Sequence, residues 1–78
     1  MTERTDETAD VRDMLCAQAL AHVDRAMRHL APGQTLDIVG NGPDVQADLL
    51  AWATGLGHEV AEVREEPDDW HLQLRRKP

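Results

Sequence analysis

The sequence predicts a single α/β (α+β) domain: a two-layer sandwich with elements in the order β-α-β-α-β-β. Two amphipathic stretches with helical spacing alternate with short apolar stretches that are typical of strands. The last two extended stretches are separated by a polar turn, which indicates a hairpin. A chain of 78 residues is long enough for one small domain and no more. We therefore expect a mixed four-stranded sheet with both helices on one face.

Composition narrows the functional classes. The net charge of −7 argues against binding to nucleic acid or to an anionic membrane, because phosphate recognition depends on Lys and Arg. A single cysteine cannot form an internal disulfide, which fits a reducing compartment. No apolar run is long enough to span a membrane, and the N-terminus lacks the apolar core of a signal peptide. We therefore expect a cytoplasmic protein without a membrane partner.

The first half of the chain is predicted to hold a tail, a strand and a helix. Residues 1–8 are polar without an apolar period, which predicts a disordered tail before a domain over 9–78. Residues 9–15 are predicted to form a strand, although their alternation is poor. Residues 17–30 are predicted to form a helix whose apolar stripe is Leu20, Val23, Met27 and Leu30.

The middle of the chain continues with a strand, a loop and a second helix. Residues 35–39 predict a strand that points Leu36 and Ile38 to one face. Pro43 suits the first position of a helix over 43–56, because its missing N–H is not needed there. The stripe of this helix is Val45, Leu49, Trp52 and Leu56.

The C-terminal part predicts an antiparallel hairpin of strands over 58–65 and 70–75. In the first of these strands Val60 and Val63 have an odd separation, so either one of them faces outward or a bulge intervenes. The first two strands of the chain are joined through a helix and should be parallel. The predicted core is Leu20, Val23, Met27, Leu36, Ile38, Leu49, Trp52, Leu56, Leu72 and Leu74.

Cys16 is the candidate catalytic residue, because it lies where an extended segment gives way to a helix. The unpaired N–H groups of the first turn, around Ala17 and Gln18, and the positive end of the helix dipole favour a thiolate. A thiolate is the nucleophilic form of cysteine. The alternative is that Cys16 is a small buried apolar residue on the same face as Leu20.

A second candidate feature is the loop of Gly40, Asn41 and Gly42. It follows the second parallel strand, as Cys16 follows the first, so both should lie at the same edge of the sheet. Glycines there would let backbone N–H groups approach a bound anion at the start of a helix. The alternative is a plain turn.

Several segments together resemble the TusA/SirA-like sulfur-carrier proteins, over about residues 10–76. The matching features are Leu15-Cys16, Pro32-Gly33 before a strand, Pro43-Asp44 at a helix start, and Gly57-His58 before another strand. The resemblance implies the same fold and a persulfide carried on Cys16. It implies a sulfur donor of the cysteine desulfurase or rhodanese type and an acceptor protein of the DsrE-like type.

The sequence departs from the family's Cys-Pro-x-Pro motif at both prolines, since it has Cys16-Ala17-Gln18-Ala19. Asp13 stands where the family usually has a glycine. Prolines would stiffen the first turn, whereas alanine permits the helix but specifies it less. Asp10 and Asp13 should oppose a thiolate. We expect the pKa of Cys16 to lie below that of a free thiol only if the helix terminus outweighs these carboxylates.

Two functional classes stay open on these residues. The first is a persulfide carrier centred on Cys16, and the second is a non-catalytic adaptor of the same fold that has lost the proline motif. RNA binding through the open sheet face is disfavoured by the negative charge. No cofactor is expected, and no metal site, since His22 and His29 lack a third ligand nearby in sequence.

Overall fold

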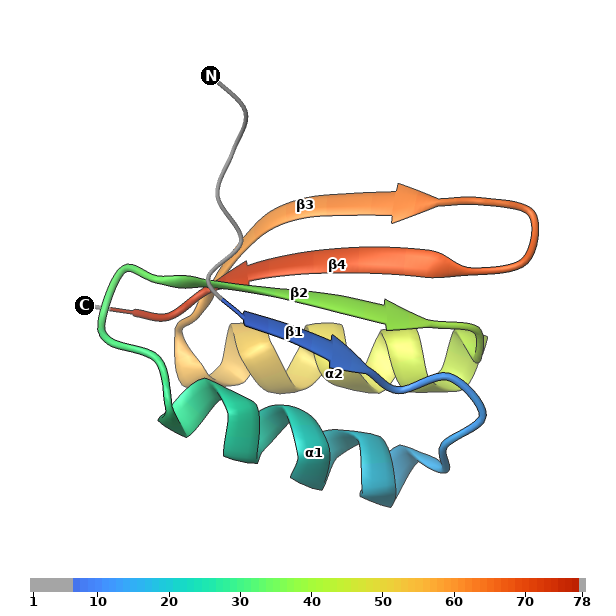
Figure 1. The fold of residues 1–78 in the computed structure, drawn as a ribbon, viewed down its shortest axis with the longest axis horizontal. Coiled ribbons are helices and arrows are strands. Elements are labelled where there is room, and N and C mark those ends of the chain that lie inside the picture. The colour runs from blue at the N-terminus through green and yellow to red at the C-terminus, as the bar shows by residue number, and fades with distance from the viewer. Residues whose placement is uncertain (1–6, 78) are drawn as a thin grey trace.

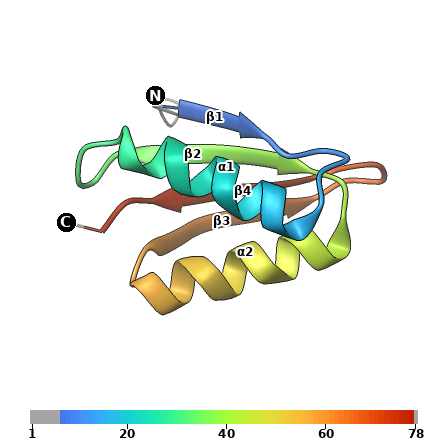
Figure 2. The ribbon, with the colours of Figure 1, turned by 90° about the horizontal axis from the view of Figure 1, so that it is seen from below.

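The computed structural model describes residues 7–77 and shows a four-stranded sheet covered on one face by two helices (Figures 1 and 2). The strand order is β1-β2-β4-β3. β1 runs parallel to β2, while β4 pairs antiparallel with both β2 and β3. The predicted class and order are therefore confirmed. The elements are β1 (Glu7–Asp10), α1 (Cys16–Arg28), β2 (Thr35–Gly40), α2 (Pro43–Leu56), β3 (Glu59–Glu65) and β4 (Trp70–Arg75).

The core lies between the sheet and the two helices. In the central strands Leu36 lies opposite Leu74 and Ile38 opposite Leu72, and all four are fully buried. Alternation along both strands puts these four side chains on the face that the helices cover. The core is completed by small and aliphatic residues and one aromatic: Ala9, Val11, Ala19, Val23, Met27, Leu30, Val45, Leu49, Ala53 and Trp70.

The first strand differs from the prediction at both ends. It begins at Glu7, so the last two residues of the predicted tail belong to the sheet; residues 1–6 lie outside the described part of the chain. It ends at Asp10, not at Leu15, because the Asp10 carboxylate accepts bonds from the backbone N–H and the guanidinium of Arg12. These bonds turn the chain, and residues 11–15 form a loop instead of strand.

Both helices are amphipathic as predicted, but the most buried positions are partly different. In α1 the buried residues are Ala19, Val23 and Met27, while Leu20 is half-buried. In α2 they are Val45, Leu49 and Ala53, while Trp52 is half-buried. The prediction of a buried Leu56 is wrong, because it is the last residue of α2, lines an open cavity and is 43% exposed.

The uncertain facing of β3 is resolved by a bulge. Val60 pairs with Leu74 and Glu62 with Gln73, so Ala61 is the extra residue. After the bulge Val63 pairs with Leu72, which returns both valines to the helix-facing side. Because β3 is an edge strand, Val63 is still 46% exposed.

Candidate functional site

Cys16 is the first residue of α1, directly after the loop that follows β1. Leu15 is the N-cap, with extended backbone and no side-chain oxygen to cap the helix. The Gln18 side chain instead folds back, and its Oε1 accepts the Leu15 N–H at 3.0 Å. This is one half of a capping box, so Gln18 shapes the helix start on which Cys16 lies.

The Cys16 side chain is partly buried and packs against the edge of the core. Leu15, next to it, is 73% exposed, which makes it the most exposed large apolar residue in the described chain. The position is therefore intermediate between an accessible thiol and a buried apolar residue: the side chain contacts apolar neighbours and still reaches the surface.

Acidic residues of α2 raise the pKa of Cys16. The largest cause is a hydrogen bond from the thiol to the Asp48 carboxylate, followed by partial burial and by the negative charges of Asp48 and Asp44. A backbone hydrogen bond at Cys16 acts in the opposite direction but is weaker. The condition for a lowered pKa is therefore not met, because the Asp48 carboxylate opposes the thiolate more strongly than the backbone hydrogen bond at the helix start favours it.

The opposing carboxylates are not the ones that the sequence pointed to. Asp10 is paired with Arg12 at 2.8 Å, and this contact lowers the pKa of Asp10 to about 2. Asp13 is hydrogen bonded to Asn41. Asp48 is far from Cys16 in sequence and reaches it only because α1 and α2 pack side by side.

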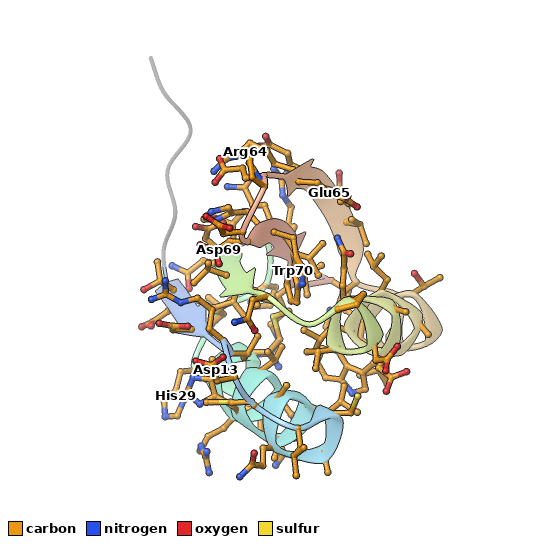
Figure 3. All side chains as sticks on the ribbon, turned by 90° about the vertical axis from the view of Figure 1, so that its right-hand side faces the viewer. Asp13, His29, Arg64, Glu65, Asp69 and Trp70 are labelled. Carbon is orange, nitrogen blue, oxygen red and sulfur yellow. The ribbon has the colours of Figure 1, made fainter. Side chains whose placement is uncertain are left out.

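The loop before Cys16 and the loop after β2 meet, as predicted, at the same edge of the sheet (Figure 3). The Asp13 N–H donates to Asn41 Oδ1 at 3.0 Å, and Asn41 Nδ2 donates to Asp13 Oδ1 at 2.9 Å. The Val11 N–H also donates to the Val39 carbonyl at 2.8 Å. Asn41 therefore joins the two loops through its two hydrogen bonds to Asp13.

Asp13 has a φ of +62°, the left-handed conformation that favours glycine. It is the only non-glycine residue of the described chain with a positive φ. Aspartate tolerates this region better than most residues because its short side chain bonds locally, and here it bonds to Asn41. The backbone explains why a glycine suits this position and how an aspartate can replace it.

Gly40 is required by packing with Trp70, its partner in the neighbouring strand. A Cβ at Gly40 would lie 2.3 Å from Cζ2 of the Trp70 ring. The ring is buried, and its Nε1–H donates to the Gly42 carbonyl at 2.9 Å. Gly42 itself has a φ of −98°, and a Cβ there would make ordinary van der Waals contact with Val45 at 3.4 Å, so neither strain nor close packing requires a glycine there.

The comparisons with known proteins agree with this arrangement. The family model described as sulfurtransferase TusA matches residues 7–76. The chain belongs to the TusA family. It is 29% identical over 77 residues to the sulfur carrier protein TusA of Pseudomonas aeruginosa, covering 99% of this chain and 98% of that protein.

Two further TusA relatives are similar over nearly their full length. The sulfur carrier protein TusA of Pseudomonas paraeruginosa is 29% identical over 77 residues, covering 99% of this chain and 98% of that protein. The sulfur carrier protein TusA of Pseudomonas entomophila is 26% identical over 72 residues, covering 92% of this chain and 90% of that protein.

The sequence of this TusA domain did not predict the contact of Asp48 with Cys16 or the hydrogen bonds of Asn41 to Asp13. The available signal for Asp48 was its spacing of four from Asp44, which puts both carboxylates on one face of α2. Among the described residues, no group of three or more His, Cys, Asp or Glu side chains is arranged to hold a metal ion. No helix in the same range is long and apolar enough to cross a bilayer.

Proposed function

We propose that this TusA-family protein is a sulfur carrier that holds sulfane sulfur as a persulfide on Cys16. The observation that carries the proposal is the place of this thiol, the first residue of a helix and partly exposed, in a chain that matches the TusA model over residues 7–76. The relatives named sulfur carrier protein TusA support the same role.

The proposed transfer moves one sulfur atom without net oxidation. The Cys16 thiolate attacks the outer sulfur of a donor persulfide, a bond forms between Cys16 Sγ and that sulfur, and the donor's S–S bond breaks. The donor cysteine leaves as a thiol. In the second half, an acceptor thiolate attacks the same sulfur and Cys16 leaves. The step needs neither a metal nor a cofactor.

Asp48 and Asp44 set the resting state of this thiol. Because they raise its pKa, the thiolate fraction of Cys16 at neutral pH is lower than that of a free cysteine. A cationic group from a docked protein beside Asp48 would weaken this effect and lower the pKa. We therefore expect transfer to be faster within a docked complex than with a small-molecule thiol or persulfide.

The proposed partners are a sulfur donor protein of the cysteine desulfurase or rhodanese type and an acceptor protein of the DsrE-like type. The exposed Leu15 beside Cys16 is the apolar contact that such partners would cover. The proposed role is cytoplasmic, since a cysteine that works as a thiol needs a reducing compartment.

Intact-mass measurement tests the carrier role. The protein is incubated with a cysteine desulfurase and cysteine, or with a sulfur-charged rhodanese, and is expected to gain one sulfur atom that a reductant removes. Cys16→Ala should gain none. Asp48→Asn should load faster at neutral pH, whereas Asp24→Asn, a matched change elsewhere on the helices, should not.

The second candidate function is a non-catalytic adaptor of the same fold. Two observations favour it: alanines replace both prolines of the family motif, and the pKa of Cys16 is raised. If Cys16 gains no sulfur from any donor, and the double variant Ala17→Pro with Ala19→Pro gains none either, the adaptor function replaces the carrier function.

A further inference from the structure

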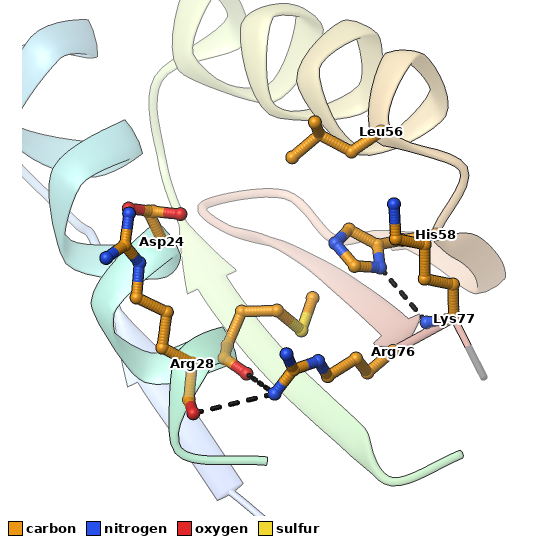
Figure 4. Close-up of a pocket in the computed structure, with 7 residues that line it drawn as sticks. Asp24, Arg28, Leu56, His58, Arg76 and Lys77 are labelled. Atoms are coloured by element: carbon orange, nitrogen blue, oxygen red, sulfur yellow. Dashed lines mark hydrogen bonds and ion pairs between the residues drawn. The ribbon is translucent and has the colours of Figure 1, made fainter. Parts of the chain in front are cut away.

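A cavity of about 140 Å³ is lined by residues from the C-terminal ends of both helices (Figure 4). It is formed where the last turns of α1 and α2 approach the chain that follows β4. Arg28, which lines it, is twelve residues beyond Cys16 in the same helix, or about 18 Å along the axis at 1.5 Å per residue. It is therefore separate from the sulfur site.

The cavity is cationic in a chain whose net charge is −7. Three of the eight Lys and Arg residues line it, namely Arg28, Arg76 and Lys77. Asp24 is the one carboxylate among the described residues that line it, and it pairs with Arg28 at 3.1 Å. These described side chains carry two more positive than negative charges, which attracts an anion.

Arg76 is held in place before any ligand arrives. Its Nη1 donates to the carbonyls of Met27 at 3.2 Å and Arg28 at 3.5 Å, and also to that of Leu30. Its Nε and Nη2 make no hydrogen bond to another described residue. A guanidinium that is already oriented loses little freedom when it binds an anion with these remaining donors.

His58 supplies a further donor. Its Nδ1 accepts the Lys77 N–H at 3.1 Å, so the neutral ring carries its proton on Nε2. Burial and the charges of Lys77 and Arg76 lower the pKa of His58, so this ring experiences the positive potential of the cavity. Asp24 and Arg28 face the same cavity from α1, while the α2 residues against the ring, Trp52 and Leu56, are uncharged.

We propose that this cavity binds a small anion with several negatively charged oxygens, a phosphate group or a dicarboxylate. Arg76, Lys77 and the Nε2–H of His58 are the donors, and Met27 and Leu56 form an apolar wall for a short hydrocarbon portion. The proposal concerns a site that the sulfur transfer does not use.

The test is a titration of the full chain, labelled for NMR, with inorganic phosphate, with succinate, and with sodium chloride at equal ionic strength. Phosphate or succinate is expected to give saturable shifts at His58 and Lys77 and to raise the pKa of His58, while chloride gives neither. Because a bound anion favours the protonated ring, its affinity should increase as the pH falls through this pKa. Saturation by only one of the two anions identifies the ligand class and supports the proposal.

Matched variants distinguish binding at this cavity from a general effect of positive charge on the protein. Lys77→Gln should weaken the affinity by roughly threefold to tenfold, and Arg28→Gln with Lys77→Gln by more. Arg64→Gln removes the same charge from β3, where Arg64 pairs with Glu62 and Glu66, and should change nothing. Arg76 stays unaltered because it holds the end of α1. The proposal is overturned if the NMR shifts rise linearly with the concentration of both anions, without saturation, or if Lys77→Gln and Arg64→Gln change the anion affinity equally. Neither result bears on sulfur loading of Cys16.

Discussion

Gly40→Ala should destabilise the protein strongly, because the added Cβ has no room beside Trp70. It would lie 2.3, 2.4 and 2.8 Å from the ring atoms Cζ2, Cη2 and Cε2. Overpacking of this kind costs about 1–3 kcal/mol. Moving the ring also strains the Nε1–H bond to Gly42, which contributes about 0.5–1.5 kcal/mol. The reduced entropy of the unfolded chain offsets about 0.4–1 kcal/mol.

The net expectation is a loss of about 2–3 kcal/mol in the free energy of unfolding. For a domain of this size it corresponds to a fall in Tm of roughly 10–20 °C. Urea unfolding followed by circular dichroism measures the loss. Gly42→Ala is the matched control and should change stability by less than about 1 kcal/mol, since its nearest neighbour is Val45 at 3.4 Å.

A double-mutant cycle identifies the cause. Trp70→Phe removes the ring atoms that the new Cβ would meet, so Gly40→Ala should cost much less in that background. The reasoning is refuted if the free energy of unfolding of Gly40→Ala lies within about 0.5 kcal/mol of that of the wild type, or if Gly40→Ala lowers it equally in the Trp70→Phe background.

Three further outcomes are expected. Asp48→Asn should lower the pKa of Cys16, so the rate of alkylation should rise at lower pH; an unchanged profile contradicts the assigned cause. Asn41→Ala removes both bonds to Asp13 and should cost about 1–2 kcal/mol in urea unfolding, with faster amide exchange in the loop before Cys16. Stability should fall as the pH drops from about 4 to 2, because the carboxylate of Asp10 protonates near 3.8 when unfolded and near 2 when folded; Asp10→Asn should flatten this part of the pH profile.

Much of the fold could be predicted because the signals are local. Alternation in β4 and the helical spacing of α1 and α2 depend on neighbours within a few residues, and the turn residues between them mark the boundaries. The edge where the loop before Cys16 meets Asn41 also followed, since parallel strands place their carboxyl ends together. The end of β1 did not follow, because a side-chain bond from Arg12 to Asp10 decides it.

The sequence by itself determined that one cysteine stands at the start of a helix in a small acidic α/β domain. Only the tertiary structure decided how acidic that thiol is. The helix terminus belongs to Cys16's own segment and is visible in the sequence, whereas the carboxylate of Asp48 arrives from another helix through packing. The cationic cavity has the same origin, since Arg28 and Lys77 are 49 positions apart and meet only in the fold. Electrostatic effects depend on distance in space, and distance along the chain does not report it.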